Sequence, residues 1–134
     1  MILIDTNVFM YAAGRSSPQR APCRRFLDDV VRGDSDFEVR TDAEVLQEIL
    51  HRYRIIESAE KGTALFDAVL GLDIPVLPVT ETALRHARGL LEDVPRLSTR
   101  DAVHVGVMVE HGISRVLSYD RGFDGIAGIE RLEP

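Results

Sequence analysis

Short aliphatic runs alternate along the chain with longer stretches in which apolar residues recur every three or four positions. The aliphatic runs predict β-strands at about residues 1–4, 37–40, 75–79, 115–118 and 129–132. The longer amphipathic stretches predict helices at about residues 6–13, 20–32, 42–54, 59–70, 80–93 and 99–111. Strands that alternate with helices in this way predict an α/β layer fold with a parallel sheet.

Several of these boundaries have a local chemical cause. Pro75 and Pro78 bracket one predicted strand, and proline cannot donate to a sheet ladder, so this strand is expected at an edge of the sheet. Thr80 is a typical N-cap for the helix that follows it. Ser98 and Asp101 form a variant of the capping box at the start of the last helix.

The composition is that of one globular domain, expected to span residues 1–134. Hydrophobic residues make up 45% of the chain and are spread along it, which argues against disorder. Cys23 is the only cysteine, so no intrachain disulfide is expected. The N-terminus lacks the basic segment of a secretory signal, and no apolar run reaches the ~18–20 residues of a membrane helix. We therefore expect a cytoplasmic protein without a membrane segment.

Two acids directly follow predicted strands. Asp5 comes after the run 1–4, and Asp120 comes after the run 115–119. In open α/β sheets the carboxyl ends of parallel strands form the ligand-binding edge. A simpler interpretation stays open for each, because Asp5 could cap the following helix and Asp120 could be a turn former. Asp124 is a second candidate in the same loop, but Asp120 is closer to the strand.

Glu48 lies on the predicted helix 42–54, close to the margin of its buried face. At about 100° per residue, Glu48 lies beside Val45, whereas Glu44 points almost to the opposite side. The residues expected to define the buried face are Val45, Leu46, Ile49, Leu50 and Tyr53. The alternative for Glu48 is a solvated acid paired with Arg52 at i+4.

Asp101 precedes a run, residues 102–109, that is apolar nearly all round. This run predicts a buried helix, on which Asp101 shares a face with Val105 and Met108. A carboxylate in that position needs a partner. The alternative is that Asp101 merely caps the first turn behind Ser98.

Acids gathered at one edge of a sheet repel one another and lose hydration, so they require protonation or a bound cation. Ligation by oxygen alone favours Mg²⁺ or Mn²⁺ over zinc. His104 and His111 lack the i, i+4 spacing of a zinc site, and we interpret them as packing or surface residues. The sequence contains no GxGxxG, P-loop or GxSxG motif.

The net charge of −6 at first argues against a nucleic-acid partner, because phosphate affinity is mostly electrostatic. Two divalent cations bound among the acids would bring the net charge to about −2 and make the acidic cleft attractive to phosphate.

Four segments, taken together, resemble the four acidic motifs of PIN domains. Their order, spacing and total length are most similar to those of the VapC toxins of type II toxin–antitoxin pairs, and the resemblance covers essentially the whole chain. The segments are Asp5-Thr6-Asn7-Val8, Val45-Leu46-Gln47-Glu48-Ile49-Leu50, Leu97-Ser98-Thr99-Arg100-Asp101-Ala102-Val103-His104 and Leu117-Ser118-Tyr119-Asp120-Arg121-Gly122-Phe123.

The resemblance implies a PIN-like three-layer α/β/α sandwich with a central, mainly parallel sheet. It also implies a Mg²⁺- or Mn²⁺-dependent endoribonuclease with an RNA substrate, a small VapB-like antitoxin as partner and a homodimeric state. The acidic quartet, catalytic and metal-binding, would be Asp5, Glu48, Asp101 and Asp120, and the supporting polar residues would be Thr6, Asn7 and Ser118. The family commonly has Thr where this chain has Ser118, a change that keeps the hydroxyl.

Within the quartet, Asp5 and Asp101 are the first choice as direct ligands of the metal ion. Glu48 and Asp120 would complete the coordination shell, directly or through water.

Two other functions are alternatives to this hypothesis. Phosphoaspartyl chemistry, as in phosphatases or receiver domains, also places an Asp at a strand end, but it normally needs a lysine near a later strand. The only lysine here, Lys61, lies in a predicted helix in the middle of the chain. A non-catalytic PIN-like binding module is the second alternative, and the complete quartet disfavours it.

Overall fold

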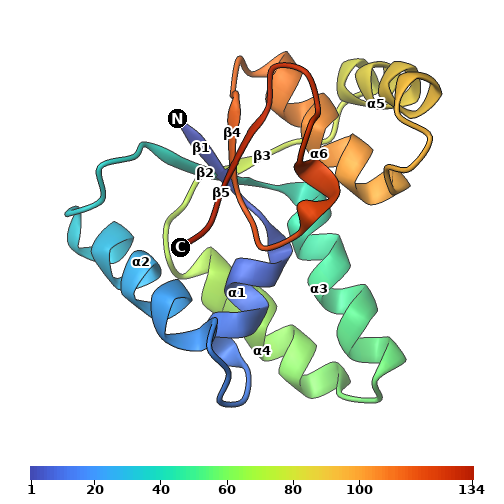
Figure 1. Ribbon diagram of the computed structural model, residues 1–134. Helices are drawn as coiled ribbons and strands as arrows, with labels where there is room; N and C mark the ends of the chain where they lie inside the picture. Colours follow the sequence, from blue (N-terminus) through green and yellow to red (C-terminus); the bar gives the residue numbers. More distant parts are fainter.

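The computed structural model describes residues 1–134 and consists of a central sheet covered by helices (Figure 1). The strands are β1 (Ile2–Ile4), β2 (Val39–Asp42), β3 (Val76–Leu77), β4 (Arg115–Leu117) and β5 (Glu130–Leu132). The helices are α1 (Thr6–Ala13), α2 (Arg20–Arg32), α3 (Ala43–Ile55), α4 (Ala59–Leu70), α5 (Glu81–Asp93) and α6 (Thr99–Glu110), with a short 3₁₀ helix, η1 (Arg121–Phe123).

The five strands form one parallel sheet in the order β3-β2-β1-β4-β5. From β1 the chain proceeds outward to β2 and β3, and it then crosses back to place β4 on the other side of β1. The strand order therefore reverses at β1, and in open parallel sheets the crevice at such a reversal is where ligands bind. The ends of β1, β2 and β4 all lie at this crevice.

Helices cover both faces of the sheet, with α1 to α4 on one side and α5 and α6 on the other (Figure 1). Each face of the sheet has its own hydrophobic core. In strand β1, Ile2 and Ile4 pack into the core under α1 to α4, and Leu3 packs into the core under α5 and α6. All three of these side chains are fully buried, as expected for the central strand of a sheet covered on both faces. The predicted three-layer α/β/α sandwich with a parallel sheet is confirmed.

Helix α6 is held closely against α5 by a glycine. A Cβ atom on Gly106 would lie only 2.1 Å from the carbonyl oxygen of Ala83, so no larger residue fits this crossing without a shift of the backbone. From Ala102 to Met108 every residue of α6 is buried. The first turns of α6 are therefore fixed relative to the sheet edge.

Most predicted elements agree with the structure to within one or two residues. Proline-flanked β3 is an edge strand, as expected, and the side chains of Thr80 and Ser98 cap α5 and α6. Strand β2 differs most, because it runs from Val39 to Asp42 instead of over residues 37–40. Asp42 therefore ends β2 and does not lie inside the following helix, and the 3₁₀ helix η1 has no counterpart among the predicted elements.

None of the helices combines the length and the apolar character that a membrane crossing would require.

Candidate metal centre

Asp5 stands at the end of β1 and is almost completely buried, with 5% of its surface exposed. Its Oδ1 accepts a hydrogen bond from the backbone N–H of Thr6 (2.7 Å), so Asp5 is the N-cap of α1. Its Oδ2 accepts from Asn7 Nδ2 and from Ser118 Oγ, both at 2.5 Å. The capping role and a role in the site are therefore compatible, because the cap orients the carboxylate at the carboxyl edge of the sheet.

The polar residues around Asp5 join the ends of β1 and β4. Asn7 Nδ2 also donates to Ser118 Oγ (2.9 Å), and Asn7 Oδ1 accepts from the backbone N–H of Tyr119 (3.2 Å). Ser118 Oγ in turn accepts from the backbone N–H of Asp120 (2.9 Å). This network sets the direction in which the chain leaves β4.

Glu48 reaches the same edge from α3 and is buried, with 8% of its surface exposed. Its Oε2 accepts a hydrogen bond from Thr6 Oγ1 (2.6 Å). Its Oε1 lies 3.2 Å from Arg100 Nη1 and 3.5 Å from Arg52 Nε. Burial acts to raise the pKa of Glu48, but His104, Thr6 and Arg52 outweigh it and lower the pKa to about 2. Glu48 is thus held as a carboxylate.

The rest of α3 departs from the predicted helical face at two positions. Leu50, expected to be buried, is 38% exposed. Glu44, expected to point away, is half-buried, and burial raises its pKa. Because His104 and Glu48 also influence this pKa, Glu44 lies within electrostatic range of the same edge.

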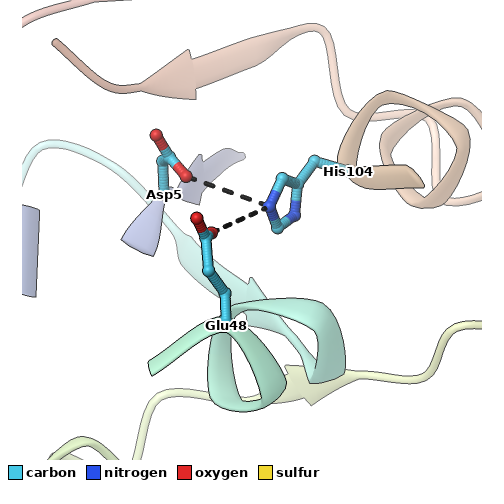
Figure 2. Close-up of side chains that lie close together, drawn as sticks. All are labelled: Asp5, Glu48 and His104. Atoms are coloured by element: carbon cyan, nitrogen blue, oxygen red, sulfur yellow. Dashed lines mark ion pairs between the residues drawn. The ribbon is translucent and has the colours of Figure 1, made fainter. Parts of the chain in front are cut away.

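His104 is the residue at this edge that the sequence interpretation missed. Its Nδ1 lies 2.8 Å from Asp42 Oδ2, and both side chains are buried. Its Nε2 lies 3.9 Å from Asp5 Oδ1 and 3.9 Å from Glu48 Oε2. Figure 2 shows the imidazole on α6 facing both carboxylates. The interpretation of His104 as a packing or surface residue is therefore incomplete, since it is buried and also belongs to the acidic cluster.

One feature of the sequence points to the pair of His104 and Asp42. Asp42 ends a strand, as Asp5 does, and its Oδ1 caps α3 by accepting from the backbone N–H of Val45 (2.9 Å). The aliphatic pattern ends two residues before the strand does, so it does not mark Asp42 as an acid at the carboxyl edge. His104 could not be assigned a partner for the same reason.

Asp101 and Asp120 approach the edge from farther out. The sequence predicts that Asp101 faces the apolar core, but the residue is only half-buried. Its Oδ2 accepts from Ser98 Oγ (2.7 Å), and its backbone N–H donates to the same hydroxyl (3.1 Å). Asp120 is exposed, and its Oδ1 accepts from the backbone N–H of Gly122 (2.7 Å).

Gly122 lies between these two outer acids. A Cβ atom at this position would be 3.1 Å from Asp120 Oδ1 and 3.2 Å from Asp101 Oδ2, so the absence of a side chain lets both carboxylates flank the same point. Asp124 in the same loop is instead paired with Arg131 at 2.6 Å. Asp120 shares the point beside Gly122 with Asp101, and it contributes to raising the pKa of Asp101.

The pKa values follow from burial and from the acids acting on one another. Burial raises the pKa of Asp5 to about 6, although His104 and the hydroxyl of Ser118 act in the opposite direction. Burial also raises the pKa of Asp101. For His104, burial lowers the pKa, but Asp42, Glu48 and Asp5 raise it well above its ordinary value. A proton on His104 and a cation among the carboxylates are therefore alternative ways to neutralise the same group of charges.

The residues present fit a divalent cation. One ligand atom each from Asp5, Glu48 and His104 can be chosen so that all three lie within 4.8 Å of one another. In addition, His104 Nε2 is buried without a hydrogen-bond partner. A set of two carboxylates and one imidazole is a common ligand chemistry for divalent metals in proteins.

Fold and centre together define an α/β protein in which acids meet a buried histidine at the carboxyl edge of a parallel sheet. Among known families, the PIN domain matches residues 2–129. The chain is 46% identical to ribonuclease VapC13 of Mycobacterium tuberculosis over 132 residues. The aligned region covers 98% of this chain and 99% of the relative. The chain therefore belongs to the PIN-domain family, within its VapC group.

Two solved structures share the fold. VapC20 of Mycobacterium tuberculosis, described as a sarcin-ricin loop cleaving toxin, has a TM-score of 0.75 at 19% identity, covering 96% of this chain and 98% of that chain. VapBC2 from Rickettsia felis, solved with a DNA fragment from its promoter, has a TM-score of 0.76 at 12% identity. The match covers 99% of this chain and 98% of that chain. At these identities the likeness concerns the fold alone.

The pKa of Asp5 gives a first prediction. In EDTA, the ¹³C chemical shift of the Asp5 carboxyl should titrate near pH 6, because burial disfavours its charged form. Since this folded-state pKa lies above the ordinary value of 3.8, ionisation of Asp5 should reduce the free energy of unfolding as the pH rises between these two values. Addition of Mg²⁺ should move the midpoint to lower pH. A midpoint near pH 4 in EDTA would contradict the burial argument.

Proposed function

We propose that this chain is a metal-dependent endoribonuclease, the toxin of a toxin–antitoxin pair, and that residues 1–134 act as a single nuclease domain. The observation that carries the proposal is the convergence of Asp5 and Glu48 on a buried, unpartnered histidine nitrogen in a chain of the VapC group. The ribonuclease name of the relative at 46% identity supports the same activity. An RNA substrate implies that the protein acts in the cytoplasm.

The chemistry proposed is hydrolysis of an RNA phosphodiester bond with Mg²⁺ or Mn²⁺. A divalent ion bound at this edge would lower the pKa of an attacking water and stabilise negative charge on the scissile phosphate. Asp5 and Glu48 are the carboxylates placed to hold such an ion at the inner end of the site. Asp101 and Asp120 lie farther out, where they can hold a water or complete the coordination shell.

The supporting polar residues hold these acids in place. Thr6 donates its hydroxyl hydrogen to Glu48, and Asn7 and Ser118 donate to Asp5. Each of these hydrogen bonds favours the charged form of its acceptor. Thr6, Asn7 and Ser118 are therefore proposed to position the carboxylates, with no direct contact to the substrate required.

Two arginines next to the acids can attract the RNA backbone. Arg52 and Arg100 both lie within ion-pair distance of Glu48, and each side chain is more than 40% exposed. Guanidinium groups suit bidentate contacts with phosphate. The overall charge of −6 is thus compatible with RNA binding where these arginines border the site.

The two alternative functions are less well supported. A phosphoaspartyl enzyme normally needs a lysine near a later strand, but the only lysine of this chain, Lys61, lies on α4. A non-catalytic binding module would have no need for inward-facing acids at such proximity. Neither alternative is favoured by the VapC relatives.

Paired substitutions in one loop test the catalytic assignment. Asp101→Asn and Asp120→Asn should each reduce EDTA-sensitive RNA cleavage by on the order of 100-fold, because each removes a carboxylate from the site. Asp124→Asn is the matched control and should retain activity, since this acid pairs with Arg131. Cleavage is measured on a labelled RNA with added Mg²⁺ or Mn²⁺, and circular dichroism checks the fold of each variant. Full activity of Asp101→Asn would exclude the proposed site.

A groove next to the site is the proposed place for the antitoxin. Its volume is about 1070 Å³, and it runs from Asn7 at the acidic edge between the α1–α2 loop and the helices α3 and α4. Its apolar lining includes Met10, Tyr11 and Ile56, and its basic lining includes Arg15, Arg52 and Lys61. This lining suits a peptide with apolar anchors and acidic groups. We propose that a small VapB-like antitoxin binds here and that the toxin itself forms a homodimer.

Ile56 provides a test of this groove. It is 61% exposed although it is a large apolar residue, so Ile56→Glu should weaken antitoxin binding without loss of RNA cleavage. Val31→Glu is the control, because Val31 is equally exposed at 62% but does not line the groove. Size-exclusion chromatography with light scattering on the toxin with and without antitoxin measures the complex and the dimer together. Equal antitoxin binding by both variants would exclude the groove, and a monomeric toxin would exclude the homodimer.

A further inference from the structure

His104 Nε2 is a buried polar atom that the hydrogen bonds of the protein do not explain. The residue is 1% exposed, and this nitrogen has no hydrogen-bond partner. The two nearest carboxylate oxygens, Asp5 Oδ1 and Glu48 Oε2, are both 3.9 Å away, which is too far for a hydrogen bond. A buried nitrogen left unpaired is energetically costly, so its placement calls for a partner that lies between it and the carboxylates.

The spacing excludes a direct hydrogen bond and agrees with a shared ion. Direct hydrogen bonds would bring nitrogen and oxygen to about 2.7–3.2 Å. Two ligand atoms that share an ion at about 2.1 Å from each are roughly 3.0–4.2 Å apart, depending on the angle at the ion. Both separations of 3.9 Å fall in the second range. Figure 2 shows the nitrogen directed at the two carboxylates from the opposite side.

The other face of the imidazole is arranged as in histidines that bind metals. Asp42 Oδ2 can only accept, so Nδ1 of His104 carries the hydrogen and donates it over 2.8 Å. In the neutral imidazole this leaves a lone pair on Nε2. Asp42 is itself fixed, because it is 0% exposed and its Oδ1 caps α3 at Val45. A carboxylate that orients a histidine in this way is the usual outer partner of a metal-binding imidazole.

We propose that His104 Nε2 is a direct ligand of the metal ion, together with Asp5 and Glu48. The centre is then a mixed nitrogen and oxygen site, instead of the all-carboxylate site that the acidic motifs alone predict. This inference rests on the proposed function, which supplies the metal ion. It adds a histidine ligand and a preference between metal ions. Mg²⁺ prefers oxygen ligands, whereas imidazole suits transition metals, so the site should bind Mn²⁺ more tightly than Mg²⁺.

Pulsed electron paramagnetic resonance of the full chain loaded with Mn²⁺ tests the proposal directly. The spectrum should show coupling to a ¹⁴N nucleus, and labelling of the histidines alone with ¹⁵N should replace it by ¹⁵N coupling. This result requires no mutation, so it does not depend on whether a variant folds. A chain that fails to bind Mn²⁺, or a Mn²⁺ spectrum without histidine nitrogen coupling, overturns the proposal.

Substitutions identify which histidine is responsible. His104→Gln should remove the coupling and weaken Mn²⁺ binding by about 10- to 100-fold, with a smaller loss for Mg²⁺, as measured by calorimetry. His86→Gln is the matched control on the exposed surface of α5 and should change neither. A purely structural role for His104 would weaken the binding of both ions equally, and that result would contradict the proposal.

Asp42→Asn is a second, milder variant. The amide oxygen can keep the cap on Val45, and the amide NH₂ group then faces Nδ1, which moves the imidazole proton to Nε2 and removes the lone pair. Nitrogen coupling should be lost although His104 is still present, and retained coupling would count against the proposed orientation. The proposed function and the proposed ligand can be tested separately. Histidine coupling in a protein that does not cleave RNA would refute the ribonuclease activity but would still support His104 as a metal ligand.

Discussion

Repulsion among buried carboxylates at the carboxyl edge of the sheet is the constraint on which the rest of this structure depends. Asp5, Asp42 and Glu48 are all buried within reach of one imidazole. Such a group of charges is stable only where hydrogen bonds, protons or a cation compensate it. Part of this compensation comes from the backbone, since Asp5 is the N-cap of α1 and Asp42 is the N-cap of α3.

The compensation is divided between the inner and outer parts of the site. At the inner end, Thr6, Asn7 and Ser118 donate hydrogen bonds to Asp5 and Glu48, and His104 faces both acids. At the outer end, Asp101 and Asp120 are held by Ser98 and by a backbone amide, and they remain in contact with solvent. The inner end is therefore suited to hold an ion, and the outer end is open to solvent.

Much of this arrangement could be predicted from the sequence because its causes are local. The strand that ends at Ile4, the helix caps at Thr80 and Ser98, and the edge strand between two prolines each follow from a few neighbouring residues. Four acids in order along the chain indicated the family, and the PIN-domain match confirmed it. The individual site roles of Asp5, Glu48, Asp101 and Asp120 stay predictions.

The parts that escaped prediction depend on contacts between residues far apart in sequence. His104 on α6 and Asp42 at the end of β2 are 62 positions apart, so no local periodicity reveals their pairing. Asp101 follows the helical face of Val105 and Met108, but its position in the first turn leaves it half-buried. The end of β2 moved by two residues because Thr41 and Asp42 pair with β3, a partner that the local sequence does not specify.

The most direct test of the central claim is the position of an ion in a crystal of the full chain grown with Mn²⁺, located by anomalous scattering. The account predicts a peak about 2.0–2.3 Å from a carboxylate oxygen of Asp5, at the inner end of the site and on the side facing Glu48 and His104. An ion bound only beside Asp101 and Asp120, with Asp5 outside its coordination shell, would contradict the account, as would the absence of any peak at this edge of the sheet.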